Sequence, residues 1–151
     1  MAYQNEVEKL TIIANEFRDA LDQVTNGFIT GIFSKFPKEC GADACELLQY
    51  YLLTVHQIKP DYREGKVQVT PRTLEISHCY LIVNGIIIDI TADQFDKDRF
   101  QKVIVCESNL YPLTPYFKYV RSKSGQVLTP LNDYLDSIYK LVLKRLESRQ
   151  R

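Results

Sequence analysis

The sequence predicts an α+β fold, in which N-terminal helices, one of them bearing a nucleophile, pack on an antiparallel β-sheet and a C-terminal helix closes the chain. Apolar residues recur at helical spacing near both ends, whereas the middle alternates and is rich in β-branched residues. Helices, then strands, then a helix is the order of an α+β protein. The chain has 151 residues, of which 45% are hydrophobic, so we expect one domain over residues 1–151 with a single sizeable core.

Three helices are predicted from apolar periodicity and from helix-ending residues. The first runs from about Gln4 to Val24 and ends at Asn26-Gly27. The second runs from roughly Glu39 to Val55, after Pro37. The third runs from Pro130 to about Glu147, with Thr129 as its cap and Pro130 at its first position.

Five strands are predicted between the second and third helices: Lys66 to Thr70, Glu75 to Val83, Ile86 to Thr91, Lys102 to Cys106 and Tyr116 to Arg121. Asn84-Gly85 lies between two apolar strands. Both residues tolerate the positive φ of a type I′ turn, so this dipeptide predicts a tight hairpin. Adjacent strands are therefore expected to be antiparallel.

Charge and hydropathy exclude several partner classes. Nineteen basic residues balance nineteen acidic ones, so the excess positive charge that drives nucleic-acid binding is lacking. The apolar runs are far shorter than a membrane span, which needs about 20 residues. The N-terminus lacks the pattern of a signal peptide, so we expect a cytoplasmic protein with reduced cysteines that binds neither nucleic acid nor membrane.

Cys40 is the candidate nucleophile among the four cysteines. It lies at or near the start of the second helix, where unpaired N–H groups and the helix dipole favour a thiolate and lower the cysteine pKa. Gly41 and Ala42 are small, so a substrate can approach the backbone, and the amide N–H groups here can face a developing oxyanion.

His78 and Asp89 are the candidate base and orienting acid. With a two-residue loop at Asn84-Gly85, the register pairs His78 with Thr91. Asp89 then shares the face of His78 on the diagonal, about 7–8 Å away between backbones. A three-residue loop would shift the pairing by one residue, and the side chains of His78 and Asp89 would then lie on opposite faces of the sheet. A carboxylate in an apolar strand needs a partner to offset desolvation, which makes Asp89 the most informative single residue.

These three side chains suit covalent catalysis. A Cys40 thiolate would attack an acyl carbon, His78 would take and return the proton, and Asp89 would hold the imidazole tautomer. The intermediate is a thioester.

The remaining cysteines are expected to be packing residues: Cys45, Cys79 and Cys106. A zinc site built from Cys40, Cys45, His78 and Cys79 is disfavoured because no Cys-x-x-Cys pair exists. We therefore expect no metal and no other cofactor.

Two further features have alternative explanations. Tyrosines after the candidate triad, among them Tyr111, Tyr116 and Tyr119, either line a peptide groove or, as we prefer, lie on the sheet surface. The segment from Tyr116 to Arg151 is richer in basic than in acidic side chains. A solvated helix face explains most of this excess, and an acidic partner protein is the other explanation.

Two stretches resemble the small transglutaminase-like and papain-like cysteine enzymes. Residues 36–48, FPKECGADACELL, resemble the nucleophile helix, and residues 77–95, SHCYLIVNGIIIDITADQF, resemble the strands that carry His and Asp. The order Cys, His, Asp is that of the superfamily. Cys79-Tyr80 replaces the more usual Ala-Trp after the histidine. The resemblance implies one domain of this type, with Gln94 as an oxyanion donor or site-lining residue; a cap for the next turn is the alternative for Gln94.

The expected function is that of a cysteine hydrolase or acyltransferase acting on an amide or peptide-like bond, as a peptidase, amidase, deamidase or transglutaminase-like enzyme. Its substrate would be a peptide, a protein or a small amide. The alternative is a non-catalytic protein-binding module on the same fold, acting as an immunity protein or as a regulatory partner.

Overall fold

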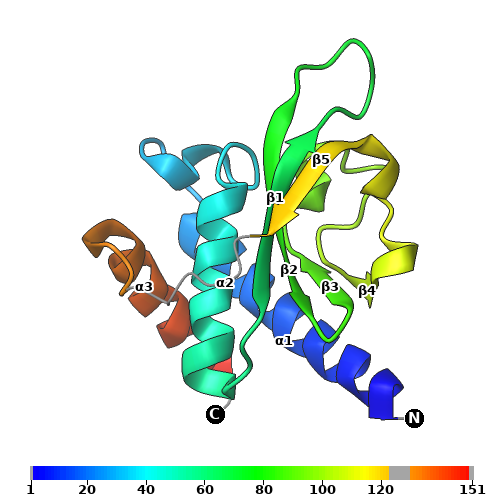
Figure 1. Ribbon diagram of the computed structural model, residues 1–151. Helices are drawn as coiled ribbons and strands as arrows, with labels where there is room; N and C mark the ends of the chain where they lie inside the picture. The colour runs from blue at the N-terminus through cyan, green and yellow to red at the C-terminus, as the bar shows by residue number, and fades with distance from the viewer. Residues whose placement is uncertain (1, 123–129, 150–151) are drawn as a thin grey trace.

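An antiparallel five-stranded sheet organises the molecule, in the order β4-β3-β2-β1-β5 (Figure 1). The computed structural model describes residues 2–122 and 130–149. The strands are β1 (Asp61–Val67), β2 (Ile76–Val83), β3 (Ile86–Asp89), β4 (Ile104–Glu107) and β5 (Phe117–Ser122). The predicted α+β class is confirmed.

Two helices, α1 (Ala2–Thr25) and α2 (Gly41–His56), pack on one face of this sheet, and α3 (Asp133–Arg149) packs against these two helices (Figure 1). Their apolar sides share one core with β2 and β3, which includes Phe17, Leu48, Leu81, Ile88 and Leu135. Both N-terminal helices lie close to their predicted bounds.

The opposite face of the sheet is covered by the chain between β3 and β5. This segment contains three short 3-10 helices, η2 (Ala92–Gln94), η3 (Ser108–Leu110) and η4 (Thr114–Tyr116); a fourth, η1 (Ile32–Lys35), precedes α2. A second apolar cluster lies here: Val67, Tyr80, Ile87, Ala92, Phe100, Ile104, Tyr111 and Leu113. Because both faces are covered, polar side chains in the middle of the sheet are shielded from water.

The β2–β3 hairpin has the predicted turn and, next to the turn, the predicted register; the predicted pair of His78 with Thr91 does not form, because β3 ends at Asp89. Asn84 and Gly85 have φ values of 51° and 79°, as a type I′ turn requires. Val83 pairs with Ile86, and β3 ends at Asp89, so the first half of β2 extends beyond its neighbour. The face on which each β2 side chain lies is thus fixed by the turn.

The first strand was predicted in the wrong place. We expected Lys66 to Thr70, whereas β1 spans Asp61–Val67; the other four strands differ from prediction by at most two residues. The charged side chains of β1 obscure the alternation of polar and apolar residues that predicts a strand. The strand is stabilised by pairing with β2 on one side and β5 on the other, which includes an ion pair between Glu64 and Arg121.

The third helix starts later than predicted. Pro130 precedes the helix, which begins at Asp133, and the side-chain oxygen of Asn132 accepts a hydrogen bond from the Leu135 N–H at 2.8 Å. Asn132 is therefore the cap, as its residue type favours. The predicted cap, Thr129, lies outside the described residues.

A buried arginine, to which the sequence analysis gave no role, ties α1 to the chain after β3. Arg18 is 3% exposed. Its guanidinium donates to both carboxylate oxygens of Asp93 at 2.9 Å and to the Ile90 carbonyl at 2.7 Å. It also lies over the Phe36 ring, 4.8 Å from the centroid. Arg18 thereby fixes the loop that follows Asp89.

We predict that Arg18→Met destabilises the protein by about 3–5 kcal/mol, because it leaves a largely buried carboxylate without its partner. The matched control is Lys102→Met, which removes a half-exposed ion pair with Asp19 and should cost about 1 kcal/mol or less. Urea denaturation measures both. Equal losses in the two variants would contradict the role of Arg18.

Candidate active site

The structure brings His78 and Asp89 into direct contact. Nε2 of His78 lies 2.7 Å from Oδ2 of Asp89, and both side chains are fully buried. The contact follows from the hairpin register, because both residues lie on the face of the sheet opposite α1, α2 and α3, where the chain leaves β3.

Asp89 is held by three donors. Besides His78, the Tyr111 hydroxyl donates to Oδ2 at 2.6 Å, and the Thr91 N–H donates to Oδ1 at 3.0 Å. Burial opposes ionisation, but the charge and hydrogen bond of His78, together with the bonds from Tyr111 and Thr91, lower the pKa of Asp89 below its ordinary value. Asp89 is thus an ionised carboxylate inside the protein.

The other nitrogen of the His78 ring faces Gln94. The Gln94 amide nitrogen lies 3.2 Å from Nδ1 and 3.4 Å from the Thr91 hydroxyl. An amide N–H only donates, so Nδ1 is the acceptor and Nε2 carries the proton toward Asp89. Phe95 packs edge-on against the ring, with centroids 5.0 Å apart. The imidazole is therefore fixed in orientation and tautomer.

Cys40 is the residue immediately before α2 and has non-helical backbone angles, with φ −140° and ψ 25°. Gly41, the first helical residue, approaches the imidazole: a Cβ atom on it would lie 3.6 Å from Nδ1 of His78 and 3.4 Å from the Gln94 amide nitrogen. The start of α2 thus lies against the proton-accepting side of the ring. The Cys40 thiol itself, 1% exposed, forms no hydrogen bond or ion pair with any described residue.

The expectation that the helix start lowers the Cys40 pKa is wrong for this closed arrangement. Burial, reinforced by the charge of Asp43, raises the pKa to about 12, and the opposing charge of Arg18 does not compensate. Desolvation of a thiolate outweighs the helix dipole here because the sulfur is shielded from water.

Gln94 and Gly41 both lie beside Nδ1 of His78. The Gln94 side chain is directed at His78 and Thr91 rather than serving as a cap. No contact in this arrangement makes Gln94 an oxyanion donor, since its N–H groups point to the ring and to the Thr91 hydroxyl.

The other cysteines have the expected packing positions. Cys45 and Cys79 are buried between α2 and the sheet, where the Tyr62 hydroxyl lies 2.9 Å from the Cys79 sulfur. Cys106 is partly buried against the second cluster. Within residues 2–122 and 130–149, no three His, Cys, Asp or Glu side chains are grouped as metal ligands would be.

Sequence reasoning missed Tyr111 as a site residue. It was assigned to the sheet surface, but it is 4% exposed and bonds to Asp89. Tyr111 comes from a loop without periodicity, between η3 and η4. The buried carboxylate signalled that a donor was needed, but no pattern indicated which loop side chain would supply it.

A cavity of about 420 Å³ leads to the site from solvent. One wall is formed by the tip of the β1–β2 ribbon, another by Lys38 and Glu39, just before Cys40, and the inner end by Gln94 and Phe95. The ribbon projects beyond the rest of the sheet (Figure 1), so it forms a wall that other strands do not reach. The cavity reaches Gln94, whose amide nitrogen lies 3.2 Å from Nδ1 of His78, while His78 itself is fully buried behind it.

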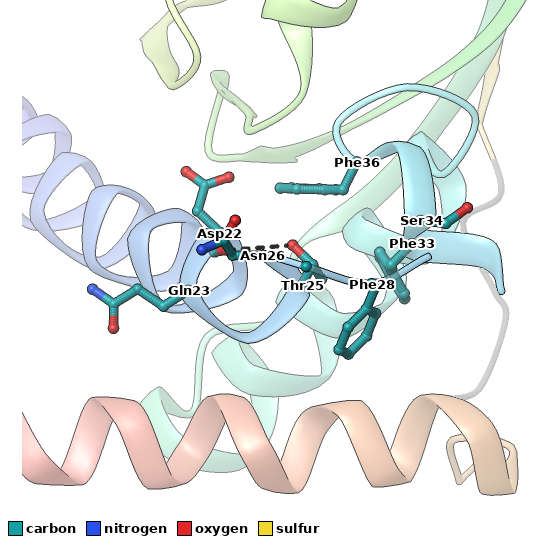
Figure 2. A pocket seen from close by; sticks show the side chains of 9 residues that line it. Asp22, Gln23, Thr25, Asn26, Phe28, Phe33, Ser34 and Phe36 are labelled. Atoms are coloured by element: carbon teal, nitrogen blue, oxygen red, sulfur yellow. Dashed lines mark hydrogen bonds between the residues drawn. The ribbon is translucent and has the colours of Figure 1, made fainter. Parts of the chain in front are cut away.

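A second cavity, of about 520 Å³, lies at the end of α1 and contains none of the predicted site residues. Figure 2 shows the Asp22 carboxylate and the Phe36 ring facing one another across it, with Phe28 and Phe33 nearby. It shares no lining residue with the first cavity.

Comparisons with protein-family models, with curated proteins and with solved structures give no match. None of the helices in the described part of the chain has the length and apolar character to cross a membrane. The functional argument therefore rests on the geometry of the site.

We predict that Asp89→Asn lowers stability at pH 7 by about 1–3 kcal/mol, because a neutral amide replaces a charged acceptor. A lowered folded-state pKa gives stability that is present above the unfolded value, about 4, and lost as pH falls through the folded value. The difference in the free energy of unfolding between wild type and variant should therefore shrink below about pH 4. Urea denaturation between neutral and acidic pH measures it.

The control is Asp98→Asn, which alters an exposed carboxylate in a loop. A gap for Asp89→Asn that stays constant with pH would contradict an ionised Asp89 bound to His78.

Proposed function

We propose that the protein is a cysteine hydrolase or acyltransferase of the transglutaminase-like and papain-like type, acting on an amide or peptide-like bond. One observation carries the proposal. A fully buried His78–Asp89 hydrogen bond orients an imidazole whose acceptor nitrogen, Nδ1, faces Gly41 at the start of α2, the residue that follows Cys40 in the chain. A purely structural histidine does not require that its second, unprotonated nitrogen face the start of the helix that follows a cysteine, behind a glutamine that lines a cavity.

The first chemical step requires Gln94 to leave Nδ1 of His78. The Cys40 thiol then gives its proton to Nδ1, and the sulfur bonds to the substrate acyl carbon. The N–H groups at the start of α2 would stabilise the oxyanion. When the C–N bond breaks, His78 returns the proton to the departing nitrogen, which leaves a thioester on Cys40.

The second step releases the acyl group. Water or an amine attacks the thioester carbon while His78 accepts its proton, and the thiol is regenerated as that proton returns to sulfur. Hydrolysis, deamidation and cross-linking share these steps and differ in the leaving group and acceptor. Asp89 stabilises the imidazolium each time and keeps its proton on Nε2.

The cavity beside Gln94 is the proposed substrate route. Its apolar walls, from Val67, Val69, Leu74, Ile76 and Phe95, suit the side chain of a peptide or protein. An occupant would reach Gln94 first and displace it from the imidazole. A reducing compartment such as the cytoplasm would keep the thiol available, and we include it in the proposal.

We predict that iodoacetamide labels Cys40 at rates that depend on His78 and Gln94. His78→Ala should slow labelling at pH 7 at least tenfold, because it removes the base, for which factors of about 100 are common. Gln94→Ala should accelerate it about fivefold, because it removes a hydrogen bond of about 1 kcal/mol that closes the site. Peptide mapping by mass spectrometry assigns the labelled cysteine.

Gln101→Ala, which removes an exposed glutamine outside the site, is the control and should match wild type. Equal labelling of Cys40 in the wild type and in His78→Ala would contradict the enzyme and favour the non-catalytic binding module.

We also predict that Leu74→Asp raises the KM for peptide substrates at least tenfold, because it places a charge in an apolar cavity wall at a cost of about 1.4 kcal/mol or more. Labelling of Cys40 by the small iodoacetamide should not change. Leu141→Asp, at an exposed leucine of α3, is the matched control. If both variants have the wild-type KM, the cavity is not the substrate route.

A further inference from the structure

We propose that Tyr111 is a positioning residue that competes with His78 for Oδ2 of Asp89 and thereby sets how strongly the carboxylate holds the imidazole. The catalytic meaning of this inference rests on the proposed function. The competition itself is a property of the buried cluster and can be measured without any activity.

The geometry sets two donors against one another. The Tyr111 hydroxyl and Nε2 of His78 both bond to Oδ2 of Asp89, at 2.6 and 2.7 Å. The other carboxylate oxygen accepts from the Thr91 N–H. The hydrogen bond from the phenol polarises electron density on Oδ2 toward Tyr111. Less electron density is then available on this oxygen for the hydrogen bond from His78. A weaker hold on the imidazole proton disfavours the imidazolium.

The phenol stays a donor over the whole working range of pH. Burial, followed by the neighbouring charge of Asp89, raises the pKa of Tyr111 well above its ordinary value. The hydroxyl is also aimed by packing, since the Tyr111 ring lies 5.0 Å from Tyr80 and 6.2 Å from Phe117 between centroids. A rigid, always protonated donor is suited to set the basicity of a buried carboxylate.

The other titratable groups around the pair are neutral at pH 7. Burial raises the pKa of the Cys45 and Cys106 thiols, which approach Asp89 from α2 and β4, and of the Tyr80 phenol on β2. On the side of Nδ1, the neighbours are the Gln94 amide and Gly41 at the start of α2; burial also raises the pKa of the Cys40 thiol, which precedes Gly41. Among the described residues, Tyr111 is thus the side chain besides His78 that donates to the carboxylate.

The test follows the ring nitrogens of His78 by ¹⁵N NMR as pH is varied. The chain has two histidines, so a His56→Gln background leaves the His78 signals alone. Tyr111→Phe should move the midpoint of the His78 transition upward by about one pH unit relative to the background protein. Tyr80→Phe removes a neighbouring phenol that forms no hydrogen bond to Asp89 and should leave the midpoint unchanged.

A second variant guards against a packing effect. Difluorotyrosine introduced at position 111 keeps the ring and makes the hydroxyl a stronger donor, so the midpoint should move downward. Opposite shifts in the two variants support the competition. Unchanged midpoints, or shifts of the same sign, would overturn it. Opposite shifts of the midpoint, together with equal labelling of Cys40 in the wild type and in His78→Ala, would support the competition and overturn only the proposed enzymatic function.

Discussion

The buried carboxylate of Asp89 is the constraint on which the site depends. An ionised group with no access to water must be surrounded by donors, and here it has His78, Tyr111 and the Thr91 N–H. Each donor comes from a different part of the chain: β2, the loop after η3, and the turn after β3. Folding of the covering segment is therefore coupled to the orientation of one imidazole, which positions it at the start of α2.

The sequence was sufficient where one strong local signal decided the outcome. Asn84-Gly85 fixed the turn, the turn fixed the register, and the register placed His78 and Asp89 on one face. The fold class followed from periodicity alone. Side chains from irregular segments could not be predicted: Tyr111 has no pattern around it, and the charged β1 does not alternate like a half-buried strand.

Two opposing effects act on Cys40, and the structure decides between them. A helix start favours a thiolate, whereas burial beside Asp43 raises the pKa to about 12. In the closed arrangement burial wins, and Gln94 holds the nitrogen that would accept the proton. Arg18 anchors the same loop through Asp93, so the chain from Ile90 to Gln94 links the stability of α1 to the state of the site.

Trapping an acyl group on the protein tests the central claim most directly. Incubation with an activated ester, such as p-nitrophenyl acetate, followed by intact-mass measurement and peptide mapping, reports which side chain becomes acylated. We expect one acetyl group on Cys40 in the wild type, little in His78→Ala and none at that position in Cys40→Ser. An acetyl group on another cysteine, or equal acylation of Cys40 without His78, would contradict the assignment of Cys40, His78 and Asp89 as one catalytic unit.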